Sequence, residues 1–239
     1  DPVRVAVPTI LGISELKDDV VREAKKTVKR KLRVGDPFDE DVFENTKESL
    51  ARVLGDRGFA FVQVTSAANV DLVSRKATAT FQVTPGPEVK FGKVVIAGLG
   101  SLPEGPVREV IALHVEQGAR YSTLVLDNLQ QALLDMGVFS TVDIVPRIKE
   151  GPPADGLVDV DIRFEPSKLH AVRAGVGIEF DSLRADVHGL LGWEHRNFFG
   201  RFRTFTIETR PGLVLYPLRV NNIVGPTHYL PENKLKLEL

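Results

Sequence analysis

Residues 171–210, AVRAGVGIEFDSLRADVHGLLGWEHRNFFGRFRTFTIETR, decide how the rest of the chain is interpreted. Apolar residues occupy every second position of this stretch in three runs, which begin near residues 172, 187 and 203. Side chains of a β-strand point alternately to opposite faces, so each run has an apolar face and a polar or small face. Runs of about ten residues with this pattern are typical of transmembrane β-strands, although an antiparallel sheet of a soluble protein alternates in the same way. The pattern alone leaves both interpretations open.

The composition of the 239-residue chain excludes several classes of protein. Its 31 basic and 32 acidic residues nearly cancel, so no global field favours nucleic acid or an anionic membrane surface. The absence of cysteine excludes disulfides and thiolate metal sites. No apolar run approaches the roughly 18 residues of a membrane-spanning helix. The chain opens with Asp1-Pro2, without an initiator methionine or a signal peptide, so we expect a processed or shortened form.

Upstream of the alternating runs, the sequence predicts a β-α-α-β-β order that occurs twice. Hydrophobic periodicity and turn residues predict elements of the first unit at residues 3–10, 14–32, 39–54, 59–65 and 76–84, with Asp39 as a helix cap and a turn at residues 69–71. Elements of the second unit are predicted at residues 89–97, 106–114, 122–136, 137–145 and 157–165.

The two units superpose with a period near 80 residues. Asp56-Arg57-Gly58-Phe59 aligns with Asp135-Met136-Gly137-Val138, and each segment ends a second helix. A repeated unit of this size indicates two small α+β modules in tandem. We therefore predict three domains: a module at residues 1–86, a module at residues 87–166 and the alternating strands at residues 167–239. Pro85-Gly86-Pro87 would be the hinge between the modules.

The order of these pieces resembles the BamA/TamA-type outer-membrane protein assembly superfamily (the bacterial surface antigen family), in which POTRA domains precede a β-barrel. The resemblance covers residues 1 to about 212, and the order is more specific than any single motif. The motifs that carry it are Arg57-Gly58-Phe59-Ala60, Pro85-Gly86-Pro87-Glu88-Val89 before Phe91-Gly92-Lys93-Val94, Gly118-Ala119-Arg120-Tyr121-Ser122, Met136-Gly137-Val138-Phe139, Gly175-Val176-Gly177 and Trp193-Glu194-His195-Arg196-Asn197-Phe198-Phe199-Gly200. The resemblance implies an α+β chain in which two β-α-α-β-β POTRA modules lead into the first antiparallel strands of a transmembrane barrel.

The resemblance also implies a topology for residues 167–239. Strands would span residues 170–180, 186–196 and 203–211, with an external turn at Asp181–Arg184, a periplasmic turn at Asn197–Gly200, an outer loop at Leu213–Pro231 and a shortened fourth strand at Asn233–Leu239. A closed barrel needs about eight strands or more. We therefore expect a fragment, or the ordered part of a longer protein, that is not itself a working pore.

The implied function is assembly, insertion or translocation of outer-membrane proteins in a Gram-negative-type cell, with the modules in the periplasm and the strands in the outer membrane. The implied partners are unfolded outer-membrane or secreted client proteins, other subunits of an assembly complex and outer-membrane lipid, with no nucleic acid. Within the family, the alternative is a two-partner secretion transporter. From a different class, it is a soluble periplasmic scaffold or binding protein.

Client binding is expected at sheet edges, where an extended client strand can pair through backbone hydrogen bonds. In each module the strand after the second helix would lie at an edge, unless the neighbouring module covers it. The candidate residues are Phe61, Val62, Gln63, Val64, Thr65, Phe139, Val142 and Ile144. In the family, the first barrel strand is the seam that opens sideways, and glycine would weaken its packing here. The candidate seam residues are Val172, Ala174, Gly175, Val176, Gly177, Ile178 and Phe180.

No catalytic constellation, cofactor motif or metal-ligand spacing is present in the sequence, so neither an enzyme nor a cofactor is expected. Trp193 is either an interfacial residue of a barrel or a core aromatic. Basic residues gather towards the end of the first helix, and they indicate either a phosphate or lipid contact or, more ordinarily, a solvated helix face. These residues are Lys25, Lys26, Lys29, Arg30 and Lys31.

Overall fold

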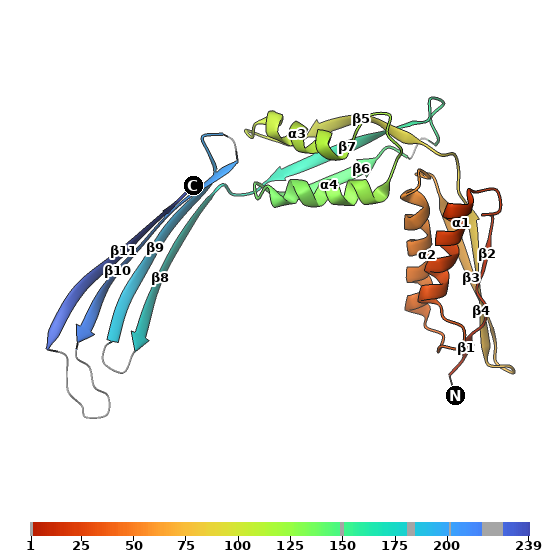
Figure 1. Cartoon of the computed structure of the whole chain (residues 1–239), viewed down its shortest axis with the longest axis horizontal. Coiled ribbons are helices and arrows are strands. Elements are labelled where there is room, and N and C mark those ends of the chain that lie inside the picture. Colours follow the sequence, from red (N-terminus) through yellow and green to blue (C-terminus); the bar gives the residue numbers. More distant parts are fainter. Residues whose placement is uncertain (1, 149–150, 181–184, 201, 217–226) are drawn as a thin grey trace. The chain divides into compact units, whose positions relative to one another are not determined.

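The computed structural model describes residues 2–148, 151–180, 185–200, 202–216 and 227–239. These residues form three β-sheets and four α-helices (Figure 1). They divide into two compact units, Asp1–Ala97 with Arg108–Ala132 and Asp143–Arg163, and Gly98–Val107 with Leu133–Val142 and Phe164–Leu239. The predicted domain ranges stay a prediction. None of the helices in the described residues has the length and apolar character needed to cross a membrane.

The first sheet is built around β4, which pairs in parallel with β1 and β2 on one side and antiparallel with β3 on the other. Helices α1 and α2 cover one face of this sheet (Figure 1). The elements are β1 (Arg4–Val5), β2 (Thr9–Leu11), α1 (Asp18–Lys31), α2 (Glu40–Gly55), β3 (Gln63–Asp71) and β4 (Lys76–Thr84). The core between the layers includes Val20, Ala24, Val28, Phe43, Leu50, Leu54, Phe81 and Val83.

Alternation and capping explain these elements. Every second residue of β4 from Ala77 to Val83 is at most 2% exposed, because this face packs under the helices. The carboxylate of Asp39 accepts a hydrogen bond from the backbone N–H of Val42 at 3.1 Å, which confirms the predicted cap of α2.

Two predictions for this sheet are wrong. The predicted strand at residues 3–10 is two short strands, because Pro8 has no N–H to donate to a ladder. The predicted strand at residues 59–65 is β3, which begins later and pairs with β4 through Asp71, so residues 69–71 are not the turn. The turn follows Asp71, whose carboxylate accepts from the N–H groups of Val73 and Ser74.

The second sheet repeats the design of the first, with the order β5-β7-β6 and β5 parallel to β7. The elements are β5 (Lys90–Ala97), α3 (Glu104–His114), α4 (Thr123–Asp135), β6 (Phe139–Pro146) and β7 (Leu157–Pro166).

A shared hydrogen-bond pattern supports the predicted repeat. Gly35 donates to the carbonyl of Val5, and Gly118 donates to the carbonyl of Phe91. Both glycines have positive φ, as do Gly58 and Gly137 after the second helix of each unit. Glycine adopts this left-handed conformation without steric cost, so the two repeats share the same two turn positions.

The third sheet is antiparallel, with the order β11-β10-β9-β8. Its strands are β8 (His170–Phe180), β9 (Ala185–Phe198), β10 (Arg203–Tyr216) and β11 (His228–Glu238). The bounds of the predicted outer loop at Leu213–Pro231 are wrong, because β10 and β11 pair from Thr206↔Glu238 to Tyr216↔His228. Residues 213–216 and 228–231 are therefore strand, and residues 217–226 of the predicted loop lie outside the described residues. The predicted external turn at Asp181–Arg184 lies outside the described residues.

Candidate functional site

The third sheet has one apolar and one polar face, and the same alternation continues through all four strands. The strand register places Val172 of β8, Trp193 of β9 and Ile207 of β10 side by side, and Leu237 of β11 follows next to Ile207. The apolar face is formed by Val172, Ala174, Val176, Ile178, Val187, Gly189, Leu191, Trp193, Phe205, Ile207, Thr209, Pro211, Leu213, Leu215, Leu237, Leu235, Asn233, Pro231 and Tyr229. The alternation predicted from residues 171–210 therefore produces one continuous surface.

This apolar face is exposed. Val176 is 93% exposed, Leu191 55% and Leu235 63%, although they lie on three different strands. Soluble monomers rarely expose contiguous apolar surface of this kind, and large patches mark protein or membrane contacts. The predicted seam residues Val172, Ala174, Val176 and Ile178 all lie on this face, whereas only the backbone pairing of Phe180, with Ala185, is described.

Aromatic rings gather near one end of the apolar face. The ring of His195 stacks on that of His170 at 4.3 Å, and Phe198 stacks on Phe205 at 4.7 Å. Trp193 contacts His170, His195 and Phe205 and is partly exposed, so it is not a buried core aromatic. Amphipathic rings near one end of an apolar strand surface are typical of the interfacial girdles of membrane barrels.

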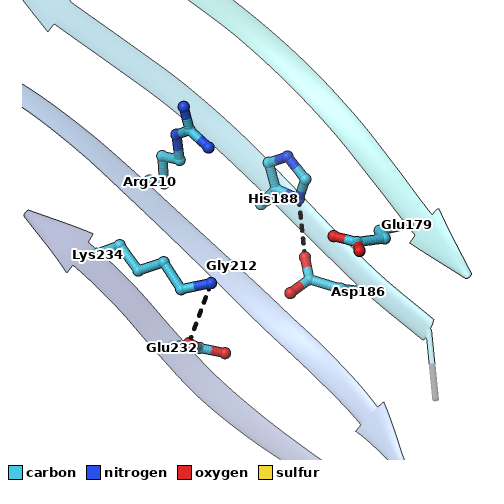
Figure 2. Close-up of a pocket in the computed structure, with 7 residues that line it drawn as sticks. All are labelled: Glu179, Asp186, His188, Arg210, Gly212, Glu232 and Lys234. Atoms are coloured by element: carbon cyan, nitrogen blue, oxygen red, sulfur yellow. Dashed lines mark hydrogen bonds and ion pairs between the residues drawn. The ribbon is translucent and has the colours of Figure 1, made fainter. Parts of the chain in front are cut away.

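The opposite face carries a polar pocket of about 60 Å³ (Figure 2). Its lining residues are Glu179, Asp186, His188, Arg210, Gly212, Glu232 and Lys234. The Nδ1 atom of His188 lies 2.9 Å from Oδ1 of Asp186, and the ammonium of Lys234 lies 3.6 Å from a carboxylate oxygen of Glu232. The part of the chain that the structure describes holds no cluster of three His, Asp or Glu residues suited to a metal ion. The pocket is a surface lined by both acidic and basic side chains.

Glycine lies beside His188 on both neighbouring strands, and Gly177 makes room for its ring. Gly177 of β8 and Gly212 of β10 are the register partners of His188. A Cβ atom at Gly177 would lie 2.5 Å from Nε2 of the ring, and one at Gly212 would lie 3.1 Å from the Cβ atom of His188. Glycine was predicted to weaken the packing of this strand. At Gly177, however, the ring of His188 fills the space that a larger side chain would occupy.

A second charged group joins this polar face to the turn after α4. Glu194 of β9 is 9% exposed and forms ion pairs with Arg173 and Arg196, the latter at 2.8 Å. The guanidinium of Arg196 also donates to the carbonyl of Gly137 at 3.4 Å, and the N–H of Ser167 donates to the carbonyl of Val138 at 2.8 Å. These contacts fix the start of the third sheet against the start of β6.

Both predicted client-binding strands lie at sheet edges. Among the described strands, β3 pairs only with β4, and β6 pairs only with β7. Gln63, Val64 and Thr65 belong to β3, but Phe61 and Val62 precede it. Of the β6 candidates, Phe139 and Val142 are buried and Ile144 is half-buried, so an edge contact would use their backbone rather than their side chains.

The residues after α2 form a joint with the start of α4. The carboxylate of Asp56 accepts from the N–H of Leu124 at 2.7 Å and from the hydroxyl of Thr123. The guanidinium of Arg120 donates to the carbonyl of Arg57 at 2.9 Å. A carboxylate from the end of one helix therefore caps the beginning of another that follows 67 residues later. The predicted hinge, Pro85-Gly86-Pro87, is thus not the only connection between α2 and α4.

Replacing Asp56 with alanine is expected to lower the free energy of unfolding by about 1 kcal/mol, because α4 loses a capping carboxylate. Amide exchange at Leu124 should accelerate in the same variant. Asp56→Asn retains an acceptor and should show a smaller loss. Asp36→Ala is the matched control, since Asp36 is exposed and does not cap α4. Equal losses in Asp56→Ala and Asp36→Ala would rule out the capping role.

The stability of the same region is expected to fall at alkaline pH. Burial raises the pKa of Tyr121 to about 12, and the charges of Asp127 and Asp56 act in the same direction. The folded state therefore retains a proton that the unfolded state loses near pH 10. The contribution of Tyr121 to the free energy of unfolding should be constant below about pH 10 and fall by about 1.4 kcal/mol per unit between about pH 10 and 12. Urea unfolding should show this decline in Tyr229→Phe, at an exposed tyrosine, and lose it in Tyr121→Phe.

Sequence reasoning missed three of these features. The Asp56 cap joins residues that are distant in sequence, and the ion pair of Glu194 with Arg173 joins two strands, so no local pattern signals either. The pair of Glu194 with Arg196 lies within β9, two residues apart. The histidine site had a signal, because glycine at position 177 interrupts an otherwise regular strand. The pairing of Gly177 with His188 became visible only in the strand register.

Comparison with known proteins gives a match for the first module and a fold for most of the chain. Residues 4–86 match the POTRA family model, described as a surface antigen variable number repeat. No curated protein matches the chain. BamA from Haemophilus ducreyi lacking POTRA domains 1–3 is 15% identical over 90% of this chain and 43% of that chain, with a TM-score of 0.55. POTRA domains 3–5 of Haemophilus influenzae BamA are 18% identical over 69% of this chain and 61% of that chain, with a TM-score of 0.57.

These similarities concern the fold. CdiB from Acinetobacter baumannii, at 15% identity and a TM-score of 0.42, is too distant to support an argument. The chain spans less than half the length of the first BamA structure. At the level of the fold, the POTRA match and the two BamA structures confirm the predicted resemblance to the BamA-type superfamily. They also confirm the α+β class, with POTRA-like segments and a β-sheet region.

Proposed function

We propose that this chain acts in outer-membrane protein assembly, insertion or translocation, with POTRA-type modules in the periplasm and the third sheet in the outer membrane. The modules would bind unfolded client strands by β-augmentation and pass them to β8, the seam strand. The observation that carries the proposal is the exposed apolar face of the third sheet, backed by a charged face. Clients would be outer-membrane or secreted proteins, and other subunits and lipid would be further partners. No enzymatic role and no nucleic acid are proposed.

The dimensions of the third sheet suit a bilayer. Its strands are 11 to 14 residues long, and a tilted strand crosses the hydrocarbon region with about 9–11 residues. The apolar face would contact lipid, while the charged face would line water, as in membrane barrels. A soluble scaffold would need another protein surface to cover the same face.

Edge strands support client binding. An unfolded chain that adds to β3 or β6 would form main-chain hydrogen bonds, which place little demand on client sequence. The seam proposal for β8 has a similar basis, since β8 pairs with β9 and with no other described strand.

The single tryptophan of the chain offers a direct test of the membrane location, because Trp193 lies on the apolar face. In vesicles or micelles with brominated acyl chains, its fluorescence should be strongly quenched. The matched reporter is Trp193→Phe/Leu190→Trp, which moves the indole three residues along β9 and onto the polar face. Quenching of that reporter by aqueous iodide, but not by brominated chains, is expected. Strong iodide quenching of Trp193, without quenching by lipid, would instead favour the soluble scaffold.

Client binding at β3 can be tested with proline at two neighbouring positions, Thr65 and Ser66. Successive amides of an edge strand point in opposite directions, so one N–H faces β4 and the other faces solvent. The proline that removes the ladder bond should lower thermal stability. The other should leave stability unchanged but weaken binding of an unfolded outer-membrane client. Unchanged client affinity in a stable variant would exclude β3 as the site and leave the membrane location untouched.

A further inference from the structure

Positive charge is concentrated in the last three turns of α1 and in the two residues that follow the helix, Leu32 and Arg33. Residues 22–33 contain seven basic residues and one acidic residue, although the whole chain has a formal net charge of −1. All seven side chains are exposed. Lys31 follows the buried residues Thr27 and Ala24 by four and seven positions, so it lies on the other side of the helix. We call the surface formed by the other six the α1 cationic face; it consists of Arg22, Lys25, Lys26, Lys29, Arg30 and Arg33.

Few of these charges are neutralised by the protein. Within the residues that the structure describes, only Lys26 of this face forms an ion pair, with Glu23 at 3.6 Å. Lys25 and Lys29 are four residues apart, as are Lys26 and Arg30, and like charges at this spacing repel on a helix. The helix dipole favours cations only in the last turn, so it does not account for Arg22 or Lys25.

The opposite side of α1 is committed to the core. Val20, Ala24 and Val28 are each at most 1% exposed. The helix therefore cannot turn an apolar face towards a membrane or a partner, and any contact through it must be electrostatic and peripheral.

Two shallow hollows follow the α1 cationic face. One, of about 270 Å³, is lined by Pro8, Ile10, Lys25, Val28 and Lys29. The other, of about 480 Å³, is lined by Asp18, Val21, Arg22, Lys25, Lys26 and Lys29. Lys25 and Lys29 border both hollows, so an anionic group in either would meet the same two ammonium groups.

We propose that the α1 cationic face binds the anionic headgroups of a phospholipid leaflet. Clusters of four to eight basic residues on one helix face attract anionic lipid, and each adds to the affinity near the surface. Three of the six are lysines, whose compact ammonium acts as a point charge that tolerates varied headgroup positions. A specific acidic peptide would be better matched by bidentate arginine pairing in a defined cleft. This surface is separate from the third sheet, so the proposal does not depend on the membrane role of that sheet.

The test uses the full chain with an environment-sensitive fluorophore on a single cysteine at Val34, which is 61% exposed at the end of the face. The chain has no other cysteine. Vesicles of phosphatidylcholine with about 30% phosphatidylglycerol should shift the emission of this label, and pure phosphatidylcholine vesicles should not. Raising the salt to about 1 M should abolish the shift, because the Debye length then falls to about 3 Å. A label at Leu113, exposed on α3, controls for lipid contacts elsewhere.

Charge reversal identifies the surface. Lys25→Glu/Lys29→Glu should weaken the phosphatidylglycerol-dependent shift by at least about tenfold in lipid concentration. Lys90→Glu/Lys93→Glu, at two exposed positions of β5, makes the same change in net charge and should behave like the parent. The neutral Lys25→Gln/Lys29→Gln should lie between them, with circular dichroism as the check on folding. An equal response in the two reversed variants would overturn the proposal. So would a shift with polyglutamate but not with the anionic vesicles, which would assign the face to an acidic polypeptide.

Discussion

Arginine in place of Leu191 is expected to destabilise the third sheet in a lipid bilayer by about 2–4 kcal/mol. Leu191 lies near the middle of β9 on the exposed apolar face, between Ala174 of β8 and Thr209 of β10. In the proposed orientation, the guanidinium of the introduced arginine would enter the hydrocarbon region, where it has no partner. Urea unfolding in vesicles, followed by the fluorescence of Trp193, would measure the loss.

The neighbouring leucine provides the control. Leu190 lies on the polar face opposite Gly175, so Leu190→Arg would extend into the charged surface rather than into lipid. We expect this variant to lose less than about 1 kcal/mol, because substitutions on the water-lined side of a barrel have small effects on stability. Equal losses in the two variants would remove the distinction between the faces on which the proposed function depends.

Phe81→Ala is expected to lower the free energy of unfolding of the first sheet and its helices by about 3–5 kcal/mol. Phe81 is 0% exposed, lies on the central strand β4, and packs against Phe43 of α2 with ring centroids 5.3 Å apart. Its removal leaves a cavity that touches both layers. Val73→Ala in the same hairpin, at a side chain that is 96% exposed, should change stability by no more than about 0.5 kcal/mol.

Thermal and urea unfolding monitored by amide exchange would separate this region from the rest of the chain. In Phe81→Ala, amides of α1, α2 and β4 should lose protection together, since they share one core. Loss of protection in β4 alone would contradict the single-core interpretation.

The sequence predicted what short periodic patterns can encode. The alternation from Val172 to Phe180 and from Ala77 to Val83 predicted strands that the structure contains, and Asp39 predicted a cap. Failures occurred where pairing with a neighbouring strand overrode local composition. Residues 213–216 and 228–231 were predicted as parts of an outer loop, but pairing between the two strands holds them in β10 and β11.

The candidate site was predicted less completely, because its contacts are long-range. Sheet edges at β3 and β6 followed from the predicted order of elements, but the exact start of β3 did not, so Phe61 and Val62 were misplaced. The Asp56 cap of α4 joins two repeats and is invisible in either repeat alone.

The histidine between two glycines limits how the third sheet can slide. If β10 moved by two residues along β9, Arg210 or Val214 would face His188, and their Cβ atoms would enter the space that Gly212 leaves open. The polar face would be preserved, but a Cβ atom at that position would crowd the Cβ atom of His188 and the carbonyl of Val187. A two-residue slide of β8 in one direction would instead bring Gly175 opposite His188, where the ring still has room. The close approach at Gly212 therefore disfavours a slide of β10, whereas Gly175 and Gly177 both leave room for the imidazole, so a two-residue slide of β8 in that direction meets no steric barrier from this ring.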